Sequence, residues 1–316
     1  MAKGKGKKTS LKNVLSSQQS RLKKKQDAAR AEQIEKAKQS ARAKGKARAL
    51  PPRPIIPFDP TDRILLIGEG NFSFARALIF NPPTSLEFLP PGNITATAYD
   101  SEDECYSKYP DAPENVDALR KKGVQVLFCV DATRLGKCSA LKRTKWNKIV
   151  WNFPHAGKGI TDQDRNILSN QVLILGFLRS AAPLLATGPI PTVMKRRNRR
   201  ADPDDDDDDV PENAEEEAVG DGSSPTVGSR GSILITLRNV PPYTLWDIPK
   251  LAKNPPPPTP ASTPVNPRYV QLRSFVFHRQ LWAGYEHRMS KGERVHGHGK
   301  TGEGGEDRTW QFCLVD

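Results

Sequence analysis

Short apolar runs that stop abruptly at glycine, asparagine or aspartate recur along the chain. The first, Ile64–Ile67, ends at Gly68-Glu69-Gly70, and apolar residues then continue at helical spacing over 72–78. This pattern predicts a strand, a tight turn and a helix. Six more runs have the length of strands and lie at 94–99, 124–130, 146–151, 232–237, 269–278 and 309–315.

Helical patterns separate the first five of these predicted strands. The longest covers 167–185, is strongly apolar and follows Thr161, a predicted N-cap, so it is expected to be buried against the sheet. The last two strands are expected to form an antiparallel edge pair. This order predicts a Rossmann-like α/β fold, with a mostly parallel seven-stranded sheet and helices on both faces.

Charge divides the chain into segments of different character. Residues 1–53 contain 17 Lys and Arg and 3 acidic residues, a net of +14, whereas the whole chain carries +13. A basic cluster at 195–200 precedes 202–221, which holds 12 Asp and Glu. We therefore predict a basic disordered tail, a folded domain in two parts and a disordered acidic insertion. These cover 1–53, then 54–186 with 231–316, and 187–230, respectively.

The tail and the cysteines bear on partners and location. Almost no large apolar side chain accompanies the basic residues of the tail, so we expect it to bind RNA phosphates or to act as a nuclear address; a solvated solubility tail is the alternative. The four cysteines form no Cys-x-x-Cys pair, and His296 with His298 lacks a third ligand, so no metal is expected. The apolar run 172–178 stops at Arg179, short of a membrane span. We expect a soluble, intracellular, monomeric protein.

The glycine turn is the first candidate binding site. Gly68 and Gly70 allow the backbone to approach a ligand at a helix N-terminus, whose first N–H groups lack helical partners. Ser73 takes the third small position of the pattern, and Glu69 adds a carboxylate that would repel a pyrophosphate. S-adenosylmethionine has no phosphate and carries an ammonium and a sulfonium, so it suits this turn better than a dinucleotide. A purely structural turn is the alternative.

Aspartates follow the second and third predicted strands. Asp100 stands where the ribose hydroxyls of a cofactor would be held, with capping of the next helix as the alternative. Asp131 is suited to accept a hydrogen bond from an adenine amino group, to cap the turn at 133–135, or to do both.

The fourth strand ends in Asn152-Phe153-Pro154-His155, the second candidate site. Because the carboxyl ends of parallel strands share one edge of a sheet, this turn is expected beside the glycine turn. An amide, an aromatic face and a titratable nitrogen together suit a flipped planar base that has to lose a ring proton. A loop histidine packed over Phe153 is the alternative.

These stretches also carry a resemblance to a known family. In ILLIGEGNFSFARAL, AYDS, VDAT, WNFPHAGKG and YEHRMSKG the chain resembles the eukaryotic large-subunit rRNA (uridine-N3) methyltransferases, over roughly 61–316 apart from the insertion. The resemblance implies a class I methyltransferase domain with S-adenosylmethionine as cofactor. It also implies a uridine of large-subunit rRNA or of a pre-ribosomal particle as substrate, and action in the nucleolus. Some relatives carry an added ferredoxin-fold anticodon-binding domain, which we do not expect here.

By position, the resemblance assigns roles to individual residues. Amino-methyltransferases carry Asn/Asp-Pro-Pro-Tyr/Phe where this chain has 152–155, so Phe153 is expected to stack on the base. The N3 proton is expected to move towards His155 or through Asn152. The cofactor is assigned to Gly68, Glu69, Gly70, Asn71, Ser73, Asp100 and Asp131. Apart from the resemblance, the basic character of His287, Arg288, Lys23, Lys24 and Lys25 makes them our candidates for phosphate contacts.

Two other classes of function share this fold. A non-catalytic ribosome-assembly factor would keep the fold and would not need the combination of Gly68, Gly70, Asp100 and Asn152. A nicotinamide-dependent oxidoreductase would use the same sheet, but Glu69, Ser73 and the basic tail disfavour it. The residues alone predict a cofactor-binding α/β domain with an RNA-binding tail, and the resemblance implies a uridine-N3 methyltransferase.

Overall fold

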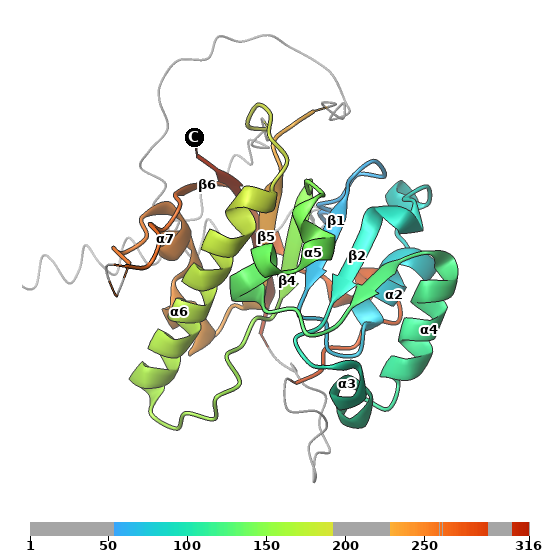
Figure 1. Cartoon of the computed structure of the whole chain (residues 1–316), viewed down its shortest axis with the longest axis horizontal. Coiled ribbons are helices and arrows are strands. Elements are labelled where there is room, and N and C mark those ends of the chain that lie inside the picture. Colours follow the sequence, from blue (N-terminus) through green and yellow to red (C-terminus); the bar gives the residue numbers. More distant parts are fainter. Residues whose placement is uncertain (1–53, 192–227, 259, 261, 290–304, 316) are drawn as a thin grey trace, which may run out of the picture. The chain divides into compact units, whose positions relative to one another are not determined.

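Seven strands form a single sheet in the order β3-β2-β1-β4-β5-β7-β6 (Figure 1). The computed structural model describes residues 54–191, 228–258, 260, 262–289 and 305–315. The strands are β1 Ile64–Ile67, β2 Ile94–Thr97, β3 Gln125–Leu127, β4 Lys148–Asn152, β5 Ser232–Arg238, β6 Tyr269–Val276 and β7 Asp307–Leu314. The first five run parallel, and β7 is antiparallel to both β5 and β6. The predicted α/β fold and the antiparallel edge pair are confirmed.

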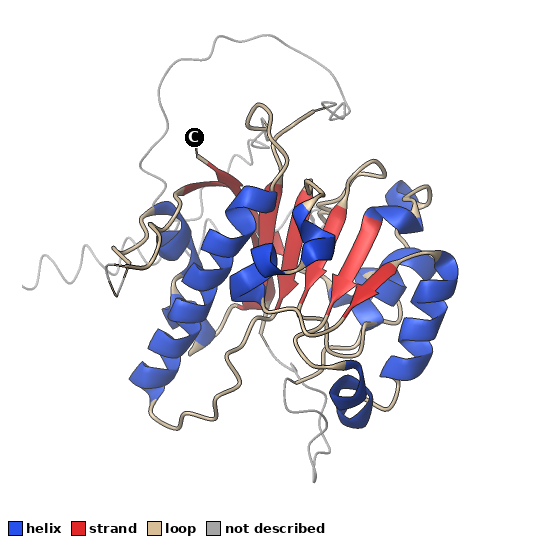
Figure 2. Cartoon of the chain, viewed as in Figure 1, coloured by secondary structure: helices blue, strands red, loops and turns tan. Residues whose placement is uncertain are grey.

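Helices cover both faces of the sheet (Figure 2). They are α2 Ser73–Phe80, α3 Glu102–Lys108, α4 Ala112–Lys122, α5 Ser139–Lys142, α6 Gln163–Ala181 and α7 Ile248–Lys253. Alternate residues of β1 supply the two cores: Leu65 and Ile67 pack on the side of α6 and α7, and Ile64 and Leu66 on the side of α2 and α4. Each of these side chains is almost fully buried and stabilises the fold by about 1.5–3 kcal/mol.

Two details of the prediction were wrong. The strand predicted at 124–130 is reduced to β3, an edge strand whose residues are partly or fully exposed. The N-cap of α6 is Asp162, whose carboxylate accepts the N–H of Arg165 at 2.8 Å, and Thr161 lies outside the helix. The charged cap suits the positive end of the helix dipole.

The long helix is only partly buried. Ile174, Phe177 and Leu178 enter the core, whereas Leu168 and Val172 point outward and are 60% and 57% exposed. The stretch Gln163–Leu184 is long and apolar enough to pass a length-and-composition test for a membrane span. Its buried face belongs to the core of the sheet, as expected for a core helix of an α/β domain.

The predicted insertion begins and ends on paired backbone. The N–H of Arg230 donates to the carbonyl of Pro189 at 2.9 Å, and that of Gly231 to the carbonyl of Ala186 at 2.8 Å. The Arg230 guanidinium also donates to the carbonyl of Gly188. These contacts join the two ends of the insertion immediately before β5. The basic tail and 192–227 lie outside the described residues.

Because the ends are joined, we predict that 192–227 can be replaced by a short Gly/Ser linker without loss of the fold. The melting temperature should stay within about 2 °C of that of the full chain, since the backbone hydrogen bonds of Arg230 and Gly231 and all the strands are kept. Thermal unfolding followed by circular dichroism measures this. A large drop in melting temperature would show that the insertion is part of the folded domain.

Candidate active site

The turn between β1 and α2 is built on a glycine with a left-handed backbone. Gly68 has φ 65°, and a Cβ atom there would lie 2.8 Å from the indole nitrogen of Trp151. Only glycine fits this conformation over the indole ring. A Cβ on Gly70 would meet the ring of Tyr109 at 3.3 Å. Because the two glycines have no side chain, the backbone of the turn can lie close to Trp151 and Tyr109.

The first N–H groups of α2 are occupied within the protein. The side chain of Asn71 accepts the N–H of Ser73 at 3.2 Å, and the Glu69 carboxylate accepts that of Ala75 at 3.3 Å. Burial raises the pKa of Glu69 to about 7, and its hydrogen bonds to the helix backbone oppose this rise. The turn therefore holds a carboxylate that ionises near neutral pH.

The turn after β4 lies beside the glycine turn, as expected. The Oδ1 atom of Asn152 is buried, and among the described residues it has no hydrogen-bond partner. Phe153 adopts φ 52°, an unfavourable conformation for a non-glycine residue. Its ring lies 4.3 Å from that of His287, and the Arg279 guanidinium carbon lies 5.0 Å from its centre. Stacking of a base on Phe153 therefore requires one of these neighbours to move.

Residues 285–289, called here the covering segment, lie over both turns. The Ser73 hydroxyl donates to the carbonyl of Glu286 at 3.0 Å and accepts its N–H at 3.1 Å. The Tyr109 hydroxyl donates to the carbonyl of Met289 at 2.8 Å. Arg288 pairs with Asp111 and with Glu286. Bonds to two separate helical regions thus hold the segment in place.

One small cavity of about 70 Å³ lies between the two turns and the covering segment. It brings together nine of the predicted residues: Gly68, Glu69, Gly70, Asn71, Ser73, Asn152, Phe153, His287 and Arg288. Three further lining residues were missed, namely Tyr109, Tyr285 and Glu286. Tyr285 and Glu286 belong to the motif YEHRMSKG, which pointed to this segment, but within it only His287 and Arg288 were predicted as site residues.

The predicted aspartates do not line this cavity. Asp100 pairs with Lys108 at 2.6 Å. Asp131 caps the following turn, where its Oδ1 accepts both the N–H and the hydroxyl of Thr133. The capping alternative is therefore realised at Asp131, and a ribose role for Asp100 would have to share its carboxylate with Lys108.

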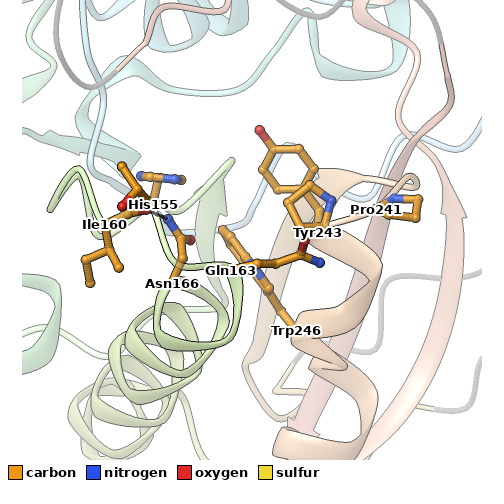
Figure 3. Close-up of a pocket in the computed structure, with 9 residues that line it drawn as sticks. His155, Ile160, Gln163, Asn166, Pro241, Tyr243 and Trp246 are labelled. Atoms are coloured by element: carbon orange, nitrogen blue, oxygen red, sulfur yellow. Dashed lines mark hydrogen bonds between the residues drawn. The ribbon is translucent and has the colours of Figure 1, made fainter.

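His155 is separated from the other predicted catalytic residues. It lines a second cavity, of about 380 Å³, formed with residues of α6 and of the segment after β5 (Figure 3). Its Nδ1 accepts the N–H of Gly157 at 2.9 Å. In the neutral ring the hydrogen is then on Nε2, so this nitrogen is a donor and not a proton acceptor. The geometry favours charge stabilisation over the general-base role predicted for His155. Pro154, which lies between Phe153 and His155 in the sequence, is buried and lines neither cavity.

The predicted phosphate contacts occupy different environments. Burial lowers the pKa of His287 to about 4, and the charges of Arg279 and Arg238 lower it further. At neutral pH this ring is uncharged, so it is a poor partner for a phosphate. Arg288 is engaged with two carboxylates. Lys23, Lys24 and Lys25 lie outside the described residues.

Comparison with known proteins decides the family. A family model described as rRNA (uridine-N3-)-methyltransferase BMT5-like matches residues 65–289, which include the glycine turn, Asn152 and the covering segment. The chain belongs to this family. The predicted enzyme class, an rRNA (uridine-N3-)-methyltransferase, is thereby confirmed.

Individual relatives agree with this assignment. The methyltransferase is 28% identical over 260 residues to a Saccharomyces cerevisiae protein named 25S rRNA (uridine(2634)-N(3))-methyltransferase, covering 76% of this chain and 69% of that protein. An uncharacterised Arabidopsis thaliana protein is 38% identical over 40% of the chain and 60% of its own length. The human ferredoxin-fold anticodon-binding domain-containing protein 1 is 36% identical over 39% of the chain and 18% of its own length. Against the last two relatives the chain spans less than two thirds of their length.

A metal was not expected, and the described residues contain no group of three His, Cys, Asp or Glu side chains that could hold one. Glu69 is the acidic residue of this site whose pKa is raised by burial, so its effect on stability can be tested by changing the pH.

We predict that Glu69→Gln stabilises the ligand-free methyltransferase at alkaline pH. The folded-state pKa of about 7 lies above the ordinary value of 4.5, so stability is highest when Glu69 is protonated and falls as the pH rises to about 7. Between pH 5 and pH 8 the wild type should lose about 2–3 kcal/mol relative to the variant. Urea unfolding at both pH values measures the difference. Glu87→Gln, which changes an exposed carboxylate, is the control; parallel pH profiles for wild type and Glu69→Gln would contradict the prediction.

Proposed function

We propose that this methyltransferase uses S-adenosylmethionine to methylate N3 of a uridine in large-subunit rRNA during ribosome biogenesis. The yeast relative is named for this reaction on 25S rRNA. The observation that carries the proposal is the cavity in which the glycine turn meets the buried, unpartnered Oδ1 of Asn152. A buried acceptor without a protein partner in this cleft supports a role in accepting a hydrogen bond from a ligand.

The residues of the glycine turn fit this cofactor. When bound, S-adenosylmethionine supplies a methyl group on a positively charged sulfur. Glu69 provides a negative charge for its ammonium, and the backbone of Gly68 and Gly70 allows close approach. A cavity of about 70 Å³ is too small for a molecule of this size, since small-molecule sites occupy roughly 300–1,000 Å³. The covering segment therefore has to move outward for the cofactor to enter.

The residues after β4 fit an imide substrate. Uridine N3 carries a weakly acidic proton, and the Oδ1 of Asn152 can accept that N–H and so align N3 for transfer. When N3 gives up its proton to solvent, negative charge develops on the uracil carbonyls, and a donor such as the Nε2–H of His155 can stabilise it. Asp100 and Asp131 stay the proposed contacts to ribose and adenine.

The basic tail completes the proposal for RNA binding. Its excess of Lys and Arg, including Lys23, Lys24 and Lys25, favours contact with RNA phosphates and action in the nucleus and nucleolus. Arg288 can contact phosphate only if it leaves Asp111 and Glu286, as it would when the covering segment opens.

We predict that Gly70→Leu weakens binding of S-adenosylmethionine by roughly tenfold or more, because its side chain would enter the space beside Tyr109 and Arg288. Isothermal titration calorimetry measures the affinity, and circular dichroism checks the fold. Gly92→Leu is the matched control, since no atom lies within 4 Å of a Cβ at that position. Equal affinities of Gly70→Leu and wild type would place the cofactor elsewhere.

We predict that Asn152→Ala binds the cofactor almost normally but transfers methyl groups on the order of 100-fold more slowly. The variant removes the acceptor for N3–H and leaves the glycine turn intact. Production of 3-methyluridine in a large-subunit rRNA transcript, followed by nucleoside mass spectrometry, gives the rate. Turnover at the wild-type rate would exclude Asn152 from the reaction.

A further inference from the structure

The second cavity lies at the same edge of the sheet as the cofactor cleft but over different strands. Its lining comes from the loop after β4, the first turns of α6 and the segment after β5. Figure 3 shows His155 and Ile160 on one side of the opening, with Tyr243 and Pro241 on the other. The proposed cofactor contacts follow β1, β2 and β3, so the cavity is on the opposite half of the sheet. It is therefore separate from the space assigned to the cofactor.

The two cavities are nevertheless close, because one turn contributes to both. Asn152 and Phe153 line the cofactor cleft, and His155 lines the second cavity. Two residues of extended chain span at most about 7 Å. A nucleotide in the second cavity is thus within reach of the cleft that holds Asn152.

The second cavity has the chemistry of a site for a neutral ring. Of the residues that the structure describes, no Asp, Glu, Lys or Arg lines it, which disfavours a phosphate or a charged ligand. Tyr243 and Trp246 provide aromatic surface, with ring centres 5.3 Å apart, and the ring of His155 lies 6.0 Å from that of Trp246. A volume of about 380 Å³ accommodates a nucleoside. Aromatic stacking on a base contributes about 1–3 kcal/mol.

Donors in the lining match carbonyl oxygens. Trp246 is only 1% exposed. Its buried indole N–H has no hydrogen-bond partner among the described residues. Leaving such a donor unpaired costs free energy, which an acceptor on a ligand would recover. The exposed side-chain amide of Gln163 gives a second donor at this cavity. Uracil has two carbonyl oxygens, whereas adenine has none.

The alternative platform is already surrounded. The ring of Phe153 has His287 at 4.3 Å, Arg279 at 5.0 Å and Phe277 at 6.1 Å. We propose that the cavity formed by His155, Gln163, Tyr243 and Trp246, and not the ring of Phe153, binds the uracil base that is methylated. This inference rests on the proposed function, because it names the place of the substrate in the same reaction.

Substitutions in the second cavity should affect RNA and not the cofactor. Tyr243→Ala and Gln163→Ala are expected to raise the KM for a large-subunit rRNA transcript, by roughly tenfold for the tyrosine, with the affinity for S-adenosylmethionine unchanged. Gln163 is exposed, so its variant carries little risk to folding. Phe88→Ala, at an aromatic residue that is 81% exposed and outside both cavities, is the control. Wild-type KM values for both cavity variants would overturn the inference.

Crosslinking tests the intact wild-type chain. A large-subunit rRNA transcript containing 4-thiouridine is irradiated with the methyltransferase, and the attached peptides are identified by mass spectrometry. We expect crosslinks within 155–166 or 241–246. Crosslinks in the folded domain that fall only near Phe153 and His287 would overturn the inference while leaving the proposed function intact. A wild-type protein that binds S-adenosylmethionine but makes no 3-methyluridine would refute the proposed function and this inference together.

Discussion

The parallel pairing of β1 with β4 is the constraint on which the site depends. Ile67 lies opposite Trp151, so the turns that follow these two residues leave the sheet side by side. The Trp151 indole then lies against Gly68 and fixes how closely the glycine turn can approach. Residues about eighty positions apart in the chain thereby share one cleft. The substrate half of the sheet follows from the next pairing, in which Asn152 lies opposite Thr236 of β5.

Local patterns predicted the parts of the site that are encoded locally. An apolar strand that stops at Gly68, or at Asn152, can be recognised from the adjacent residues in the sequence. Because the carboxyl ends of parallel strands lie at one edge of the sheet, both turns could be expected side by side. The covering segment could not be derived in this way, because the bond between Ser73 and Glu286 joins residues 213 positions apart. The direction of His155 was also beyond prediction. The left-handed backbone of Phe153 turns the chain between the two cavities, and a sequence does not reveal such a turn at a non-glycine residue.

Several groups in the cleft are held in states that the fold alone does not favour. Glu69 is a carboxylate with its pKa raised by burial, and Asn152 keeps a buried acceptor without a partner. Each lowers the stability of the ligand-free domain, and each becomes favourable when a ligand supplies a cation or a donor. The large apolar cores on both faces of the sheet outweigh these local losses. The same two groups that destabilise the ligand-free domain would therefore strengthen the binding of a ligand that pairs with them.

The left-handed residues have a consequence for the distribution of stability. Among the described residues, four non-glycine positions have positive φ: Phe72, Cys129, Phe153 and Asp247. Three of them lie within five residues of the carboxyl end of a parallel strand, namely β1, β3 and β4, and Asp247 is the N-cap of α7. Strain of this kind costs about 1–3 kcal/mol at each residue. Most of this backbone strain therefore lies near the carboxyl ends of the parallel strands. Segments of low local stability open before the core of a fold, so the amide protons of these turns should exchange with solvent before those of the buried strands.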